Sequence, residues 1–151
     1  MKILTDIERE GDQCADVCEI LSTGQVYGNS LIVSKIIQMM EAARDMFRRA
    51  MDVFISRDIE EAKDICASDD YVDNMFSKII LEISSTITQS SNVMGDVDLL
   101  LITKYAERMA DHATNIAEWV IYIETGEHPD LNKHELSSPY VRAGNDSEEE
   151  S

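Results

Sequence analysis

One acidic pattern late in the chain constrains its fold more than any other feature. Glu107, Asp111, Asn115 and Glu118 follow one another at spacings of four, four and three residues. These spacings place side chains on a single face of an α-helix. The pattern therefore predicts a helix that carries a row of oxygen-bearing side chains along one side.

An earlier segment repeats this pattern. Residues 8–12 read Glu-Arg-Glu-Gly-Asp where residues 107–111 read Glu-Arg-Met-Ala-Asp, and Glu19 stands at the offset of Glu118. Self-similarity at a fixed offset indicates a repeated structural unit. The first helix of the chain is therefore predicted to be a second copy of the last one.

Four helices are predicted from the spacing of the apolar residues. The first runs from about Lys2 to Leu21 and the second from about Leu31 to Ile55, with a loop at Gly24 and Gly28 between them. The apolar stripe of the second helix is predicted to contain Ile32, Ile36, Met40, Ala43, Phe47, Ala50 and Phe54.

The third helix is predicted to start after Asp58, with Glu61 completing a capping box, and to run toward Ile87. The fourth is predicted to start at Ser90 or Ser91 and to end at Gly126, with Gly95 inside it. The expected fold class is all-α, an antiparallel three-helix bundle preceded by one additional helix.

The chain of 151 residues is long enough for one domain with a sizeable core. We expect residues 1–24 to form the additional helix and residues 30–126 to form the bundle. Residues 127–151 lack a periodic apolar face and end in an acidic run, so they are expected to be a disordered tail.

The formal net charge of -17 comes from 30 acidic and 13 basic residues. Such a chain repels nucleic acid and anionic bilayers, whereas cations are its natural small partners. No apolar run approaches the ~20 residues of a membrane-spanning helix, and no signal-peptide pattern is present, so the chain is expected to be cytoplasmic. Cys14, Cys18 and Cys66 are predicted to be buried thiols rather than metal ligands.

A carboxylate site depends on the turn between the third and fourth helices. If this turn lies near Gln89, the pairs Asp69/Asp73 and Glu107/Asp111 stand about 18 and 20 residues from it, so at about 1.5 Å per residue they are nearly level. A turn at Gly95 would separate the pairs by about 15 Å. Level carboxylates would favour hard cations such as Mg, Mn, Ca or Fe.

Surface charge is the competing interpretation of these pairs, because a chain with 30 acids contains many such spacings by chance. Glu41/Asp45, for example, lies beside Arg44 and Arg48 and is predicted to form only local ion pairs. His112 points about 100° away from the acidic row and is predicted to be an orienting or surface residue rather than a ligand.

No nucleophile–base pair, phosphate-binding glycine loop or nucleotide fingerprint is present, so no enzyme is predicted. A metal-dependent carboxylate-bundle enzyme, such as a di-iron oxidase, would need inward-facing Glu-x-x-His motifs that the helices lack. A helical scaffold without metal also stays open as an alternative.

Residues 99–126 closely resemble the third helix of a repeat in the PhoU phosphate-uptake regulators. Residues 69–73 resemble the second acidic motif of that family, and residues 6–19 resemble the end of a preceding repeat. The family usually has two complete three-helix repeats, so the resemblance implies about one and a half repeats in this chain.

The resemblance implies a metal site on the bundle surface, with a divalent or iron-type ion that could be Fe, Mn, Mg or Zn. Its implied ligands are Asp69, Asp73, Glu107 and Asp111, with Glu8 and Asp12 as a weaker half-site. It also implies a negative modulator of phosphate uptake and signalling. The implied partners are the ATPase subunit of the phosphate-specific ABC transporter and the phosphate-sensor histidine kinase.

The first helix is expected to lack the other two helices of its repeat. Its apolar surface is predicted to comprise Ile3, Ile7, Cys14, Val17, Cys18 and Leu21. Leaving this surface in water would sacrifice ~25 cal/mol per Å² of apolar area, so a homodimer is expected to cover it. Glu10 occupies a position that would be apolar in many members of the family, which indicates altered packing there.

Overall fold

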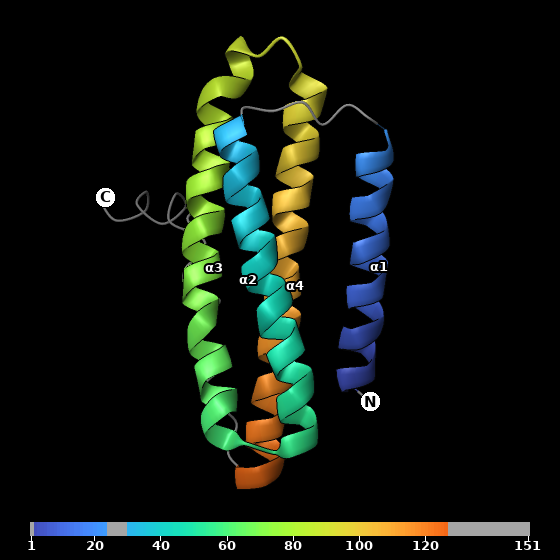
Figure 1. Cartoon of the computed structure of the whole chain (residues 1–151), viewed down its shortest axis with the longest axis vertical. Helices are drawn as coiled ribbons and strands as arrows, with labels where there is room; N and C mark the ends of the chain where they lie inside the picture. Colours follow the sequence, from blue (N-terminus) through green and yellow to red (C-terminus); the bar gives the residue numbers. More distant parts are fainter. Residues whose placement is uncertain (1, 24–29, 127–151) are drawn as a thin grey trace, which may run out of the picture.

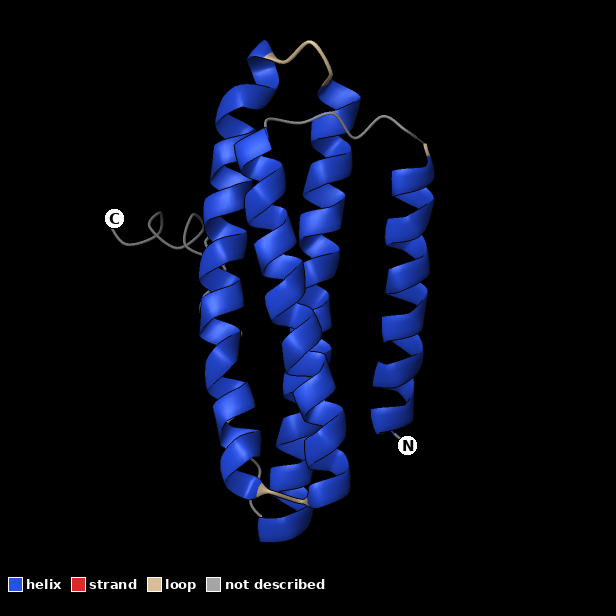
Figure 2. Cartoon of the chain, in the orientation of Figure 1, coloured by secondary structure: helices blue, strands red, loops and turns tan. Residues whose placement is uncertain are grey.

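The computed structural model describes residues 2–23 and 30–126, and every regular element in these ranges is a helix (Figure 2). The elements are α1 (Lys2–Ser22), α2 (Ser30–Ser56), α3 (Ile59–Thr86), the short 3₁₀ helix η1 (Ile87–Gln89) and α4 (Val93–Thr125). The predicted all-α class is confirmed. The expectations for Gly24, Gly28 and residues 127–151 lie outside the described residues.

Three of the helices form a bundle and the fourth lies against one side of it. Figure 1 shows α2, α3 and α4 packed together, with α1 beside α4 and antiparallel to it. Among the described helices, α1 contacts α4 but neither α2 nor α3. The described helices also include none whose length and apolar character would suit a bilayer crossing. The predicted arrangement of a three-helix bundle and one additional helix is therefore confirmed.

The core fills the space between α2, α3 and α4. Its largest fully buried apolar side chains are Met39, Ile65, Ile79, Ile83, Leu99, Ile116, Val53, Val72 and Val120. In α2 the predicted stripe is shifted, because Met39 and Val53 are completely covered while Met40 and Phe54 are only half-buried. Because α2 contacts both α3 and α4, its buried face is wider than the predicted stripe, and the centre of that face lies to one side of the stripe.

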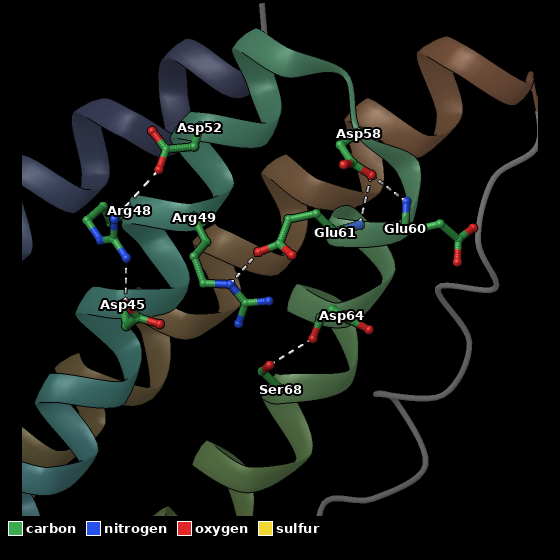
Figure 3. Close-up of polar contacts among 9 residues, drawn as sticks. All are labelled: Asp45, Arg48, Arg49, Asp52, Asp58, Glu60, Glu61, Asp64 and Ser68. Carbon is green, nitrogen blue, oxygen red and sulfur yellow. Dashed lines mark hydrogen bonds and ion pairs between the residues drawn. The ribbon is translucent and has the colours of Figure 1, made fainter.

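The junction between α2 and α3 has a side-chain cap. The Asp58 carboxylate accepts hydrogen bonds from the backbone N–H groups of Glu60 and Glu61 at 3.0 and 3.2 Å (Figure 3). The predicted capping box does not close. The Glu61 carboxylate instead accepts a hydrogen bond from Arg49 Nε at 2.6 Å, which ties α3 to α2.

On the outer side of α2, Arg48 forms ion pairs with Asp45 at 3.0 Å and with Asp52 at 3.8 Å (Figure 3). All three side chains are mostly exposed, so these pairs contribute little to stability. The prediction that Asp45 belongs to a surface ion pair is confirmed.

The turn between α3 and α4 lies near Gln89, the position that makes the two acidic pairs level. After η1, the Asn92 side chain caps α4 by accepting a hydrogen bond from the Gly95 backbone N–H at 3.2 Å. Gly95 is therefore in the first turn of α4, and the helix begins two to three residues later than predicted. At the other end α4 stops as predicted at Gly126, whose φ of 74° is a left-handed conformation that glycine adopts easily.

Candidate functional site

The register between α3 and α4 follows from two contacts. Lys104 Nζ of α4 lies 5.2 Å from the centre of the Phe76 ring of α3. Burial, followed by the negative charges of Glu118 and Asp69, raises the pKa of the Cys66 thiol to about 12. Residues 66–76 of α3 are therefore level with residues 104–118 of α4. The alternative turn at Gly95, which would have separated the acidic pairs, is excluded.

Between these contacts, the pair on α3 is level with the pair on α4. Asp69 is 2% exposed and Asp73 is half-buried. Asp111 is also half-buried, and the Glu107 side chain is 16% exposed. Both helices thus present carboxylates at one height and partly out of water, where the attraction of a cation is strengthened.

The oxygen donors at this site suit a hard cation, but their side chains are not arranged to coordinate one. Glu107 forms an ion pair with Lys104, one turn earlier on the same helix. Within residues 2–23 and 30–126, no group of three or more His, Cys, Asp or Glu side chains is already arranged around a metal position. Oxygen donors at one level suit Mg, Mn, Ca or Fe. Coordination by Glu107 would require this side chain to leave Lys104.

The earlier copy of the acidic pair lies apart from this site. Glu8 and Asp12 are exposed on α1, whereas Glu10 and Gln13 are buried against α4. Helical spacing places the two sets on opposite faces of α1. The structure therefore does not bring Glu8 and Asp12 together with the carboxylates of α3 and α4.

His112 is at the centre of the packing between α1 and α4. Its Nε2 atom lies 2.9 Å from Gln13 Nε2, and its Nδ1 atom lies 3.2 Å from Asp6 Oδ1. The Gln13 amide can only donate through its nitrogen, so Nε2 of the ring accepts and Nδ1–H donates to Asp6. Burial lowers the pKa of His112 although the Asp6 charge opposes this shift, which favours the neutral ring that this chain of hydrogen bonds requires.

The prediction of a surface position for His112 is wrong, because the residue is 6% exposed. A usable signal was present in the sequence. Asp6, Glu10 and Gln13 follow the helical spacing that also contains Ile3 and Val17, which marks a buried face with polar members. Gln13 and His112 moreover occupy equivalent positions of the repeat, because they are 99 residues apart, as are Glu8 and Glu107.

Glu10 brings a carboxyl group into the same interface. It is 6% exposed, and burial raises its pKa from 4.5 to about 7. Its Oε2 atom is buried and accepts no hydrogen bond from the described residues. The equivalent position on α4 is the buried Met109, so this repeat position is buried in both copies and holds a carboxyl group in α1. The expectation of altered packing relative to other family members stays a prediction.

The expectations for the three thiols and for the apolar surface of α1 need correction. Cys14 and Cys18 are exposed rather than buried, and Cys66 is intermediate. The predicted apolar surface of the first helix is also divided, because Ile3 and Val17 are buried by packing of α1 on α4. The reason is that the helix has two apolar faces, of which α4 covers one.

Comparisons with known proteins agree with this architecture. The family model described as the PhoU domain matches residues 36–120. A curated relative from Clostridium acetobutylicum, described as a phosphate-specific transport system accessory protein PhoU homolog, is 30% identical over 133 residues. That alignment covers 87% of this chain and 61% of the relative.

A homologue of the same description from Thermotoga maritima is 31% identical over 138 residues, covering 83% of this chain and 55% of the relative. The crystal structure of the phosphate transport system regulatory protein PhoU from Streptococcus pneumoniae superposes with a TM-score of 0.77 at 27% identity. It matches 87% of this chain, which spans 62% of that protein. The chain thus corresponds to between half and two thirds of its relatives, and it belongs to the PhoU family.

Proposed function

We propose that this chain is a regulator of phosphate homeostasis that restrains phosphate-specific transport and its two-component signalling. The observation that carries the proposal is the level row of partly buried carboxylates on α3 and α4 in a PhoU-family bundle. The relatives are described as accessory proteins of the phosphate-specific transport system, which supports a role beside the transporter rather than a catalytic one.

The proposed working site is a metal site formed by Asp69, Asp73, Glu107 and Asp111. A divalent or iron-type cation such as Fe, Mn, Mg or Zn would relieve the mutual repulsion of these carboxylates. Glu8 and Asp12 would be at most a separate half-site, because α1 carries them on its exposed face.

The charge of the chain limits how phosphate could act. A surface with a formal net charge of -17 repels free phosphate. The proposal therefore places phosphate sensing either at a bound cation, which presents positive charge to an anion, or in the partner protein.

The proposed partners are the ATPase subunit of the phosphate ABC transporter and the phosphate-sensor histidine kinase, which the regulator would contact in the cytoplasm. The family membership of the chain supports these partners. Self-association as a homodimer is also part of the proposal.

Deletion of the gene in its native host tests the regulatory role. In phosphate-replete cells the deletion should raise phosphate uptake or the expression of phosphate-starvation genes. Unchanged values, also after deletion of any longer paralogue, would refute the proposed regulation.

Complementation of the deletion strain then tests the site. Asp73→Asn with Asp111→Asn should fail to restore regulation. The control Glu41→Gln with Asp45→Asn, which removes two exposed acids from α2, should restore it. Full complementation by the first variant would show that regulation does not use the carboxylate site.

A further inference from the structure

Lys104 places a positive charge at one end of the carboxylate row of α3 and α4. Its ammonium forms an ion pair with Glu107 and lies 5.2 Å from the centre of the Phe76 ring on α3. A cation above an aromatic face is attracted by the ring. Side chains of both helices therefore contact this ammonium and hold it beside the site.

Helical spacing aligns both contacts with the proposed ligands. On α3, Phe76 follows Asp73 by three residues, and on α4, Glu107 follows Lys104 by three. Residues three or four positions apart are neighbours on one face of a helix. Lys104 thus stands in line with Glu107 and Asp111, at the end of the row nearest the turn between the two helices.

The surroundings of the ion pair allow one cation to be exchanged for another. The Glu107 side chain is 16% exposed, whereas the Lys104 side chain is 51% exposed. An ion pair with one partner largely in water is weak, and side-chain freedom is lost to maintain it. A divalent cation has twice the charge and binds carboxylate oxygens directly, so it can take Glu107 from the ammonium. The flexible stem of lysine then lets the ammonium move into water.

We propose that Lys104 is an internal competitor of the metal for Glu107 and thereby sets the metal affinity of the site. The inference rests on the proposed metal site and adds a residue that regulates it. Carboxylates on neighbouring helices repel one another, and an ammonium at the end of their row reduces that repulsion. Metal binding must therefore replace an existing favourable contact of Glu107, against the positive charge of Lys104. Lys104 raises the metal concentration at which half of the chains are occupied.

Three variants of the full chain test this competition. Lys104→Met removes the charge and keeps an unbranched apolar stem beside Phe76. The control Lys63→Met removes the same charge from another lysine–glutamate pair with three-residue spacing, that of Lys63 with Glu60. Both side chains of the control pair are mostly exposed. Lys104→Arg retains the positive charge.

Mn²⁺ alone is the probe, and calorimetric titration of tag-free protein measures its dissociation constant. Lys104→Met should bind Mn²⁺ at least about threefold more tightly than the wild-type chain, because a competing ion pair and a repulsive charge are both removed. Lys63→Met should change the constant by less than about 1.5-fold, since its ion pair is exposed and does not involve the site. Lys104→Arg should bind no more tightly than the wild-type chain.

The background Glu107→Gln shows whether Lys104 acts by holding Glu107. This substitution should itself weaken Mn²⁺ binding, because it removes one ligand. In this background the gain from Lys104→Met should fall below about 1.5-fold, since both substitutions remove the same contact. An undiminished gain would show that Lys104 acts only through its charge at a distance, which overturns the proposal.

A measurement without metal separates this inference from the proposed site. In excess EDTA, Lys104→Met should lower the midpoint of thermal unfolding more than Lys63→Met does, because it leaves the carboxylates around Glu107 without the ammonium. If no variant binds Mn²⁺ while this difference remains, the metal site is refuted and Lys104 only stabilises the fold. If Lys104→Met and the wild-type chain bind Mn²⁺ equally tightly, the metal site stands and the competition is refuted.

Discussion

Helices α1 and α4 are two copies of one repeat helix in different surroundings. α4 contacts α1, α2 and α3, whereas α1 contacts only α4 within the described chain. The same repeat positions are therefore completely buried in one copy and exposed in the other, as at Ala113 and Cys14. The repeat therefore determines which residues share a face of the helix, and the neighbouring helices determine which of those faces are buried.

The two acidic pairs differ in the same way. Glu107 and Asp111 stand level with a second pair on α3, whereas Glu8 and Asp12 are exposed on a helix that meets no α3 equivalent among the described residues. A repeated motif therefore gives two candidate half-sites, of which one has a second pair of carboxylates level with it on a neighbouring helix.

The largest effect is expected from a charge at two matched positions of the repeat, Ala113 on α4 and Cys14 on α1. Ala113→Asp should destabilise the fold by about 4 kcal/mol or more, because it buries an unpaired carboxylate at a position that is 0% exposed. Cys14→Asp should change stability by about 0.5 kcal/mol or less, since this side chain is in water. Urea unfolding at low protein concentration measures both, and similar losses would contradict the contrast.

Glu10→Gln should give the next largest effect, and it should depend on pH. The pKa of Glu10 is about 7 in the folded chain against 4.5 for an ordinary glutamate. As pH rises from 4.5 to 7, the unfolded chain loses this proton first, so the contribution of Glu10 to stability falls and stays low above pH 7. The pKa rises from 4.5 to about 7, and this difference corresponds to a loss of at most about 3 kcal/mol in the free energy of unfolding.

Glu10→Gln should therefore stabilise the chain by up to about 3 kcal/mol at pH 8 and have little effect near pH 4.5. Urea unfolding at the two pH values measures this difference. The lowered pKa of His112 costs stability as pH falls below 6.5, but both proteins share this effect. A gain from Glu10→Gln that is the same at both pH values would exclude ionisation of Glu10 as its cause.

The smallest effect is expected from substitutions at the matched small residues Gly11 of α1 and Ala110 of α4, each replaced by the residue found in the other helix. Gly11→Ala should stabilise the chain by about 0.5–1 kcal/mol, because the new Cβ meets nothing within 4 Å. Ala110→Gly should destabilise it by about 1–2 kcal/mol, since it adds the helix cost of glycine to a lost buried methyl group. Thermal unfolding of dilute protein would show the opposite signs, and a loss of stability with Gly11→Ala would contradict open space there.

Much of the fold could be predicted from the sequence because helix periods and caps are local. Asp58 caps α3 and Gly126 ends α4 as predicted. The level register of Asp73 and Asp111 needed only helix lengths and the turn near Gln89.

The packing between α1 and α4 could not be predicted because it joins residues 106 and 99 positions apart. Asp6 and Gln13 look like surface residues until His112 is placed between them. Glu10 shows the same limit, since its pKa depends on burial by another helix. Spacing identified the faces of α1, but not which face α4 would cover.

Metal binding by two matched double variants tests most directly whether the carboxylates of α3 and α4, and not those of α1, form the working site. Stoichiometry is measured by elemental analysis of tag-free protein equilibrated with Mn²⁺ or Fe²⁺. We expect Glu8→Gln/Asp12→Asn to retain the metal bound by the wild-type chain. Asp73→Asn/Asp111→Asn should lose it with unchanged helicity, because acids that are partly exposed on the bundle surface are not needed for folding. Unchanged metal content in the second variant, or loss of metal from the first variant alone, would show that the carboxylates of α3 and α4 do not form the working site.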